Sequence, residues 1–162
     1  MKKFNKKHLY WMIPSLVLAI VLLALECLPS GVAMRFKWPI DQNAQVFASK
    51  TEYYPYFSDM PYAYGNCAPV FIGIFTIAVI ILCITNIFVD KTGIDIAILV
   101  LNVLKLVLSG VEFIFSRTAI NWSVFAIALA FTIYSGVELA LRIKSNKSTT
   151  SPTDSTADMQ NE

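Results

Sequence analysis

An ionisable side chain lies in the middle of a long apolar segment of this 162-residue chain. Residues 94–115 are mostly apolar, and Lys105 is near their midpoint. A lysine at the centre of a bilayer costs about 3 kcal/mol on insertion scales, so we expect it to face other helices or water rather than lipid. The chemistry open to it is ion or proton transfer, or binding of an anionic ligand within the membrane. The alternative is a structural lysine that bridges helices or marks an interface.

Other polar residues share one helix face with Lys105. Their spacings of three, four and seven positions bring them into a single stripe on a helix. The stripe consists of Asp95, Asn102, Lys105, Ser109 and Glu112. No acidic residue lies three or four positions from Lys105. Its charge must therefore be balanced from another helix, by water, or by loss of its proton.

Glu138, in the last apolar segment, is a candidate partner for Lys105. At 1.5 Å per residue the two differ in depth by about 9 Å, which two extended side chains can just bridge. Arg142 lies four residues after Glu138 and offers a local ion pair, the interpretation we favour for that glutamate.

Two further glutamates, Glu26 and Glu112, lie near one end of their apolar segments. We expect them to pair with basic residues of similar depth in an interfacial cluster. Those basic residues are Arg35, Lys37 and Arg117. The alternative is a cation held between the two carboxylates, which nothing in their spacing requires.

Other active sites have little support in the sequence. The chain has one histidine, His8, and no CxxC pair, so neither a zinc nor a redox centre is expected. There is no nucleotide-binding loop and no HExxH or GxSxG motif. We predict no catalytic residue, no cofactor and no metal.

Composition places these residues in an all-α membrane protein. Hydrophobic residues make up 56% of the chain and charged residues 15%, whereas soluble domains carry about 25% charged residues. Apolar segments of about 20 residues are long enough to cross a bilayer. We predict a bundle of four antiparallel transmembrane helices at residues 9–28, 69–89, 94–115 and 122–143.

The segments between these helices differ in character. Residues 1–8 are basic, and residues 29–68 form a long tyrosine-rich loop outside the cytoplasm. Short turns are expected at residues 90–93 and 116–121. Residues 144–162 are rich in serine and threonine without an apolar face, which predicts a disordered tail.

Basic residues predict the orientation. Eight lie on the side of the termini and four on the other side, so the positive-inside rule places both termini in the cytoplasm. The membrane would be a plasma membrane, of the bacterial inner-membrane type. A cleaved signal peptide is the alternative for residues 9–28, but the uncharged stretch from Leu9 to Leu25 exceeds the usual 7–15 residues.

The long loop contains a group of aromatic side chains. They are Tyr53, Tyr54, Tyr56, Phe57, Tyr62 and Tyr64. Aromatic groups suit sugars, peptides and lipid headgroups, and equally the membrane interface, which is the interpretation we favour. Prolines 55 and 61 argue against a long helix, and one short strand is expected at residues 46–48.

Two cysteines, Cys27 and Cys67, flank the loop at similar expected depth. A disulfide could form there on the extracytoplasmic side. Two free thiols are the alternative, and the sequence does not decide between them.

The predicted layout resembles that of claudin-like tetraspan proteins, with a long first outer loop and short later turns. The W–LW–C–C pattern of that family is missing, since the loop has Trp38 but no cysteine between Pro29 and Asn66. No residue or function is therefore carried over.

The leading functional hypothesis is a non-enzymatic membrane protein that acts as an interaction or accessory subunit. It would bind a membrane protein partner, or a second copy of itself, through the long loop or the polar face of residues 94–115. The second hypothesis is a small oligomeric transporter or channel with a polar path around Lys105. The third is a membrane enzyme acting on lipid. The bilayer is an expected partner, and nucleic acid is not.

Overall fold

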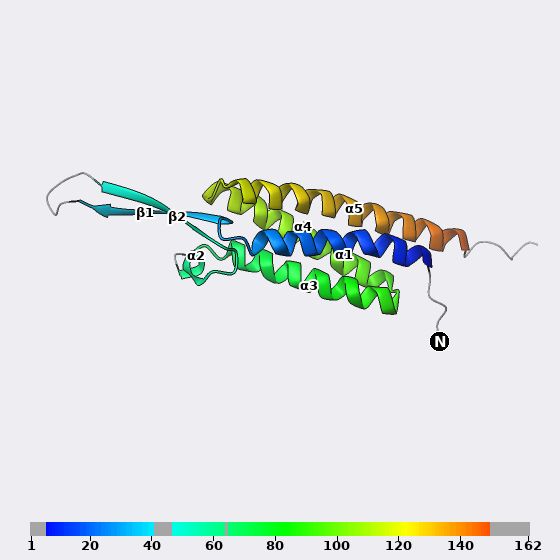
Figure 1. Ribbon diagram of the computed structural model, residues 1–162. Coiled ribbons are helices and arrows are strands. Elements are labelled where there is room, and N and C mark those ends of the chain that lie inside the picture. The colour runs from blue at the N-terminus through cyan, green and yellow to red at the C-terminus, as the bar shows by residue number, and fades with distance from the viewer. Residues whose placement is uncertain (1–5, 41–46, 64, 150–162) are drawn as a thin grey trace, which may run out of the picture.

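The computed structural model describes residues 6–40, 47–63 and 65–149, and most of them are helical (Figure 1). Four helices are long and apolar enough to cross a membrane. These are α1 (Lys6–Glu26), α3 (Ala68–Val89), α4 (Thr92–Phe115) and α5 (Ala119–Thr149). Strands β1 (Val32–Pro39) and β2 (Phe47–Tyr54) and the short helix α2 (Asp59–Ala63) lie between α1 and α3. The chain therefore has the makeup of a multi-pass membrane protein.

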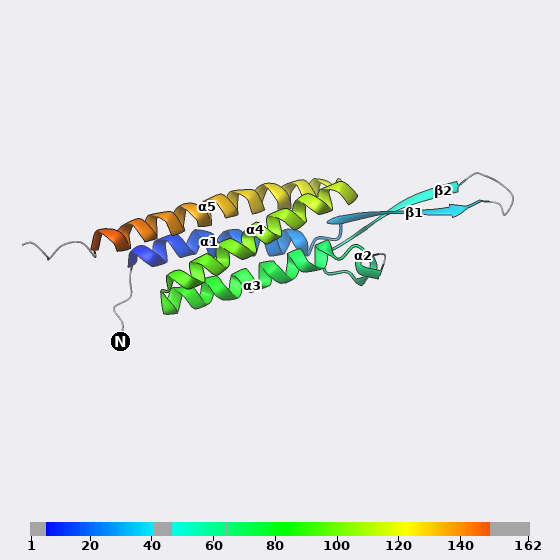
Figure 2. The same ribbon diagram turned by 180° about the vertical axis from the view of Figure 1, so that it is seen from behind.

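The four long helices lie side by side in one elongated bundle (Figures 1 and 2). Helix α4 contacts α3 and α5, and α1 contacts the same two helices from the other side, which closes a ring. Large apolar side chains cover the outer faces, among them Ile81, Phe88, Val107 and Ile133. Such exposed apolar faces are expected where helices contact lipid rather than water.

The bundle interior is rich in polar groups. Apolar residues such as Leu22, Ile72 and Phe131 are buried there. Buried with them are Ser15, Glu26, Thr76, Asn86, Asp95, Asn102, Lys105, Ser109, Glu112, Ser135 and Glu138. An apolar exterior around polar residues is what a bilayer requires, because ionisable groups are costly against lipid.

A β-hairpin occupies the connection between α1 and α3. Strands β1 and β2 pair antiparallel, from Val32 opposite Tyr54 to Pro39 opposite Phe47. Residues 47 and 48 of the short strand expected at residues 46–48 begin the eight-residue strand β2, and Val46 lies outside the described residues. The partner strand β1 is not predicted from the sequence. The all-α prediction applies to the bundle but not to this connection.

The hairpin projects from one end of the bundle along its long axis (Figures 1 and 2). We call this the hairpin end. On the hairpin surface, Lys50 forms an ion pair with Glu52 at 2.7 Å, and the Tyr54 hydroxyl donates to the same carboxylate at 2.6 Å. These contacts hold the pKa of Glu52 below its ordinary value, with the Lys50 contact as the largest cause.

Helix α5 extends beyond the expected span. It continues to Thr149, although residues 144–162 were expected to be a disordered tail. No glycine or proline lies between Ile143 and Thr149, so nothing in the sequence ends the helix earlier. Residues 150–162 lie outside the described part of the chain.

Tyr56 fixes the base of the hairpin to the bundle. Its side chain is only 1% exposed, and its backbone N–H donates to the Glu26 carbonyl at the end of α1, at 3.1 Å. The ring lies directly against Gly31, where an added Cβ would be 2.7 Å from the Tyr56 Cδ2 atom. Only glycine leaves room for the ring at this position.

We predict that Gly31→Ala destabilises the protein. The methyl group overlaps a buried ring that cannot swing out to solvent, and overpacking of this kind costs about 1–3 kcal/mol. The measurement is unfolding of the purified protein in mixed micelles, followed by helical circular dichroism. Gly93→Ala is the control, since no atom lies within 4 Å of its added Cβ. Equal stability of the two variants would contradict the account of Tyr56.

Candidate functional site: a buried polar column

The structure buries the whole polar stripe of α4 inside the bundle. Asp95, Asn102, Lys105, Ser109 and Glu112 are all buried, so the face inferred from their spacing is the inward one. Glu26 of α1 lies against the same face and interacts electrostatically with Lys105. We refer to Glu26, Asn102, Lys105, Ser109 and Glu112 as the polar column.

Lys105 is fully buried, with an exposed fraction of 0%. Its Nζ makes no hydrogen bond to any described residue. It lies 5.4 Å from the centroid of the Phe131 ring on α5, within the range of a cation–π contact. The carboxyl group that interacts electrostatically with Lys105 is that of Glu26, whereas the depth comparison pointed to Glu138 as a candidate.

Glu26 is deeper in the bundle than its place at the end of α1 suggests. The Thr76 hydroxyl, two turns into α3, donates to Glu26 Oε1 at 2.7 Å. Tyr56 and the base of the hairpin cover the end of α1, so the carboxylate is fully buried. This position brings it toward Lys105.

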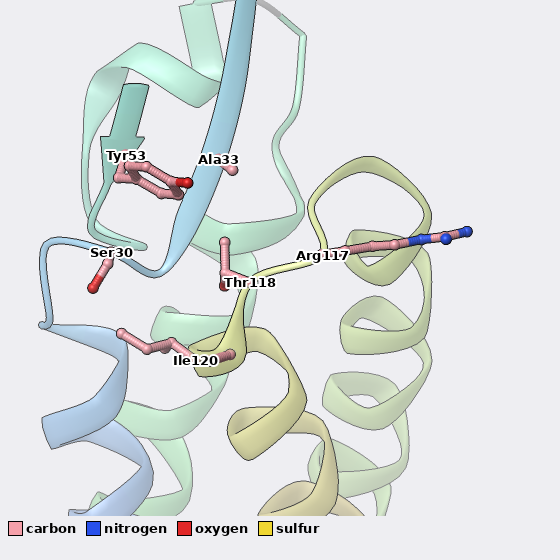
Figure 3. A pocket seen from close by; sticks show the side chains of 7 residues that line it. Ser30, Ala33, Tyr53, Arg117, Thr118 and Ile120 are labelled. Atoms are coloured by element: carbon pink, nitrogen blue, oxygen red, sulfur yellow. The ribbon is translucent and has the colours of Figure 1, made fainter. Parts of the chain in front are cut away.

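Glu112 is held from the connection before α3. The Asn66 amide donates to Glu112 Oε2 at 2.8 Å. The predicted interfacial cluster is wrong: among the described residues no ion pair joins Glu26 or Glu112 to a cation of the hairpin or the α4–α5 turn. Those cations are exposed, and Figure 3 shows the Arg117 side chain pointing away from the hairpin base.

Five buried atoms of the polar column have no hydrogen-bond partner in the described protein. They are Glu26 Oε2, Asn102 Oδ1, Lys105 Nζ, Ser109 Oγ and Glu112 Oε1. Buried polar atoms in proteins nearly always have a partner, so their concentration along one helix face points to a function for this face. The groups are suited to bind water, protons or a small ion.

A hydrogen-bonded cap closes the column at the hairpin end. The Tyr56 hydroxyl donates to Asn121 Oδ1 at 2.5 Å, and the Asn121 amide donates to the Ser116 carbonyl at 2.6 Å. Burial raises the pKa of the Tyr56 phenol, so the hydroxyl remains a donor. Asn121 thereby links the connection before α2 to the turn before α5.

Two more hydrogen bonds join the first strand to the same turn. The Ala33 N–H donates to Ser116 Oγ at 2.7 Å, and the Thr118 hydroxyl donates to the Gly31 carbonyl at 2.9 Å. The base of the hairpin is therefore fixed to both ends of the α4–α5 turn.

The opposite end of the bundle is closed by ion pairs. Arg142 of α5 pairs with Asp90, at the end of α3, and with Asp95 of α4. Among the described residues, no ion pair joins Arg142 to Glu138, the local pair favoured from the sequence. Glu138 accepts a long hydrogen bond of 3.4 Å from Ser15 of α1 instead. Two aspartates from the neighbouring helices compete successfully for one guanidinium.

The aromatic residues of the loop do not share one environment. Tyr53 is exposed and Tyr54 half-buried, because they point to opposite faces of β2. Tyr56 is buried, and Phe57 lies over Gly73 of α3, where an added Cβ would be 2.5 Å from the ring. Tyr64 and the side chain of Tyr62 lie outside the described residues.

The predicted cysteine pair is not bonded. Cys27 and Cys67 are free thiols, the first exposed and the second partly buried, and Cys83 is a free buried thiol. Of the two alternatives left open by the sequence, the structure has the free thiols.

A separate hollow of about 280 Å³ lies at the base of the hairpin (Figure 3). It is lined by Ser30, Ala33, Tyr53, Arg117, Thr118, Ala119 and Ile120. It does not include the polar column, and its one charged residue, Arg117, is exposed.

Several partners of the column were not singled out from the sequence. Thr76, Asn66 and Asn121 each hydrogen-bond within the site, at the carboxylates or at Tyr56. Thr76 could have been noticed as a polar residue inside a charge-free apolar segment. Asn66 and Asn121 lie in or beside loops, where asparagine is common and carries no such signal.

Comparison with known proteins finds no match: no family model matches the chain, and neither a curated protein nor a solved structure is significantly similar to it. Function must therefore be inferred from the geometry.

We predict that Glu26 and Lys105 are energetically coupled. Glu26→Gln or Lys105→Met removes one of two buried groups of opposite charge, and each should lower the free energy of unfolding by on the order of 1 kcal/mol, because proton transfer at the remaining carboxyl groups limits the uncompensated charge. The double variant should be clearly more stable than the sum of the two losses implies. Unfolding in mixed micelles measures all four proteins. Additive losses would show that the two side chains do not interact.

Proposed function

We propose that the protein is a non-enzymatic interaction subunit of a plasma membrane, which presents hairpin β1–β2 to a membrane protein partner. The observation that carries the proposal is the hairpin itself, which projects from the bundle while its base is fixed to the helices (Figures 1 and 2). A rigid base positions the hairpin, and its far part is free to contact another protein.

The far part of the hairpin has an unusual apolar surface. Trp38, Ile40 and Phe47 are 45%, 64% and 61% exposed. Trp38 and Phe47 lie near the far end of the hairpin on its two opposite faces, since Trp38 pairs with Ala48 and Pro39 pairs with Phe47. Exposed aromatic side chains of this kind are typical of the central residues of protein interfaces, and here each face of the hairpin presents one.

The two strands also have free edges. The described sheet has only two strands, so β1 and β2 each leave one edge unpaired. An isolated two-stranded hairpin is marginally stable in water, and an open edge can accept a strand from another protein. Binding of a partner would stabilise the hairpin as well as recognise it.

The proposal includes an orientation. We propose four antiparallel spans, and the distribution of lysine and arginine favours placing both termini in the cytoplasm. The hairpin would then lie on the extracytoplasmic side of a bacterial-type inner membrane. An extracytoplasmic hairpin can meet its partner only outside the cytoplasm, so the test must use intact cells.

We predict that the hairpin can be crosslinked from outside the cell. The variant Ser49→Cys, in a chain with alanine at its three natural cysteines, places a thiol on the exposed surface of β2. A membrane-impermeant thiol-to-amine crosslinker applied to intact cells should give one discrete adduct with a second protein, detected by electrophoresis and mass spectrometry.

Two variants control this experiment. Ser123→Cys carries the same substitution on the exposed face of α5 and should give no adduct, because that face contacts lipid. Adding Trp38→Ser to Ser49→Cys should remove the adduct while the thiol still reacts with maleimide. A thiol at Ser49 that labels only in broken cells would reverse the orientation. An adduct that survives Trp38→Ser would refute the apolar binding surface.

The polar column favours a second candidate, a small oligomeric transporter or channel. The supporting observation is the group of five buried polar atoms without hydrogen-bond partners in the described residues, four on α4 and one on Glu26 of α1. A polar row inside a membrane bundle can line a path for an ion or a proton.

For this second candidate we predict that Lys105→Met abolishes ion or proton flux in proteoliposomes, while Val107→Met leaves it unchanged. Lys105 faces the column, whereas Val107 is 60% exposed on the outside of α4. Flux is measured with a pH-sensitive dye in the vesicle interior. Wild-type vesicles that are as tight as empty ones would reject transport and leave the interaction proposal standing.

A further inference from the structure

We propose that the polar column binds one exchangeable proton, shared between the carboxyl groups of Glu26 and Glu112. This inference rests on the column that supports the second candidate function, but a proton that is bound without being transported also satisfies it. The column is thus assigned an intramembrane proton-binding site, whose ligand comes from bulk water and returns to it.

The first argument is a charge count. Ionised Glu26 and Glu112 contribute two negative charges, and Lys105 contributes one positive charge, all three at 0% exposure. One negative charge is left over. A buried charge without a counter-charge is far more costly than its neutral form, so one of the two carboxyl groups takes up a proton.

No other cation of the described chain is placed to balance this charge. Arg35, Lys37 and Arg117 are exposed on β1 and on the α4–α5 turn. Arg142 is paired with two aspartates at the opposite end of the bundle. A proton is therefore the available positive charge.

The remaining groups around the column add no positive charge that could balance the excess negative charge. Helix α3 contributes Thr76 and the Cys83 thiol, α5 contributes Phe131, and the connection contributes Asn66 and the protonated Tyr56. The other buried acids, Asp95 and Glu138, belong to the end with Arg142 and add negative charge rather than balance it.

The second argument is the pattern of hydrogen bonds. Each carboxyl group receives a hydrogen bond at one oxygen, Glu26 Oε1 from Thr76 and Glu112 Oε2 from Asn66. The other oxygen of each has no partner in the protein. A proton there turns an acceptor without a donor into a donor. Ser109, one turn before Glu112, offers a hydroxyl that can accept from one group and donate to the next.

The test is a count of protonated carboxyl groups. Infrared spectra of the full chain at neutral pH, in a detergent without ester groups, report them through their C=O stretching band. Glutamate labelled with ¹³C at the side-chain carboxyl distinguishes glutamate from aspartate. Difference spectra against the wild type cancel every group that a substitution leaves unchanged, Glu138 included.

We expect Glu26→Gln and Glu112→Gln each to lose the equivalent of one protonated carboxyl group. In either variant the remaining glutamate balances Lys105 and ionises. The double variant should also lose only one, because the wild type holds only one. Lys105→Met should gain one, since neither carboxylate then has a counter-charge. Lys105→Arg keeps the charge and should leave the count unchanged.

Other outcomes overturn the proposal. No loss in either glutamine variant would mean that both glutamates are ionised in the wild type. Loss in only one would mean that the proton is fixed on that residue and not shared. A band that does not shift in D₂O would show that the proton does not exchange. The number of protonated carboxyl groups in the infrared spectra does not depend on the flux measurement, so transport and proton binding are tested separately.

Discussion

The structure depends on the burial of a lysine charge inside a bundle whose surroundings are apolar. Lys105 cannot face lipid at acceptable cost, so α4 must turn its polar face inward, and the opposing charge must come from another helix. Glu26 of α1 supplies it. This electrostatic interaction favours one rotation of each of the two helices, since α1 and α4 are linked mainly through their common neighbours, α3 and α5.

The same residue connects the interior to the hairpin. Glu26 ends α1, and its backbone carbonyl accepts from Tyr56, which follows β2 after one residue. Tyr56 packs on Gly31 and hydrogen-bonds Asn121, so hairpin base, column and α4–α5 turn meet at one buried ring. A displacement of the hairpin base would therefore first change the contacts of Tyr56 and Glu26 at the end of the polar column. The hairpin and the polar column, the two proposed functional regions, share these contacts of Tyr56.

Much of the bundle was predictable from local properties. Hydropathy alone identifies the four long apolar helices, and helical periodicity places Asn102, Lys105 and Ser109 on one inward face. The hairpin is not predicted, because the prolines of the loop indicate irregular structure and its tyrosines indicate contact with the membrane interface. The alternation of Val32, Met34, Phe36 and Trp38 with shorter or charged residues has the period of a strand and was a usable signal.

The sequence by itself determined which segments are apolar enough for a membrane and which face of α4 must be buried, because both depend only on residue type and helical repeat. The tertiary structure decided the partners. The electrostatic interaction of Lys105 with Glu26, and the ion pairs of Arg142 with Asp90 and Asp95, depend on how deep each helix lies relative to its neighbours. At the end of α1, the hydrogen bonds of Tyr56 to Glu26 and Asn121 join residues far apart in the sequence, and no local spacing encodes such contacts.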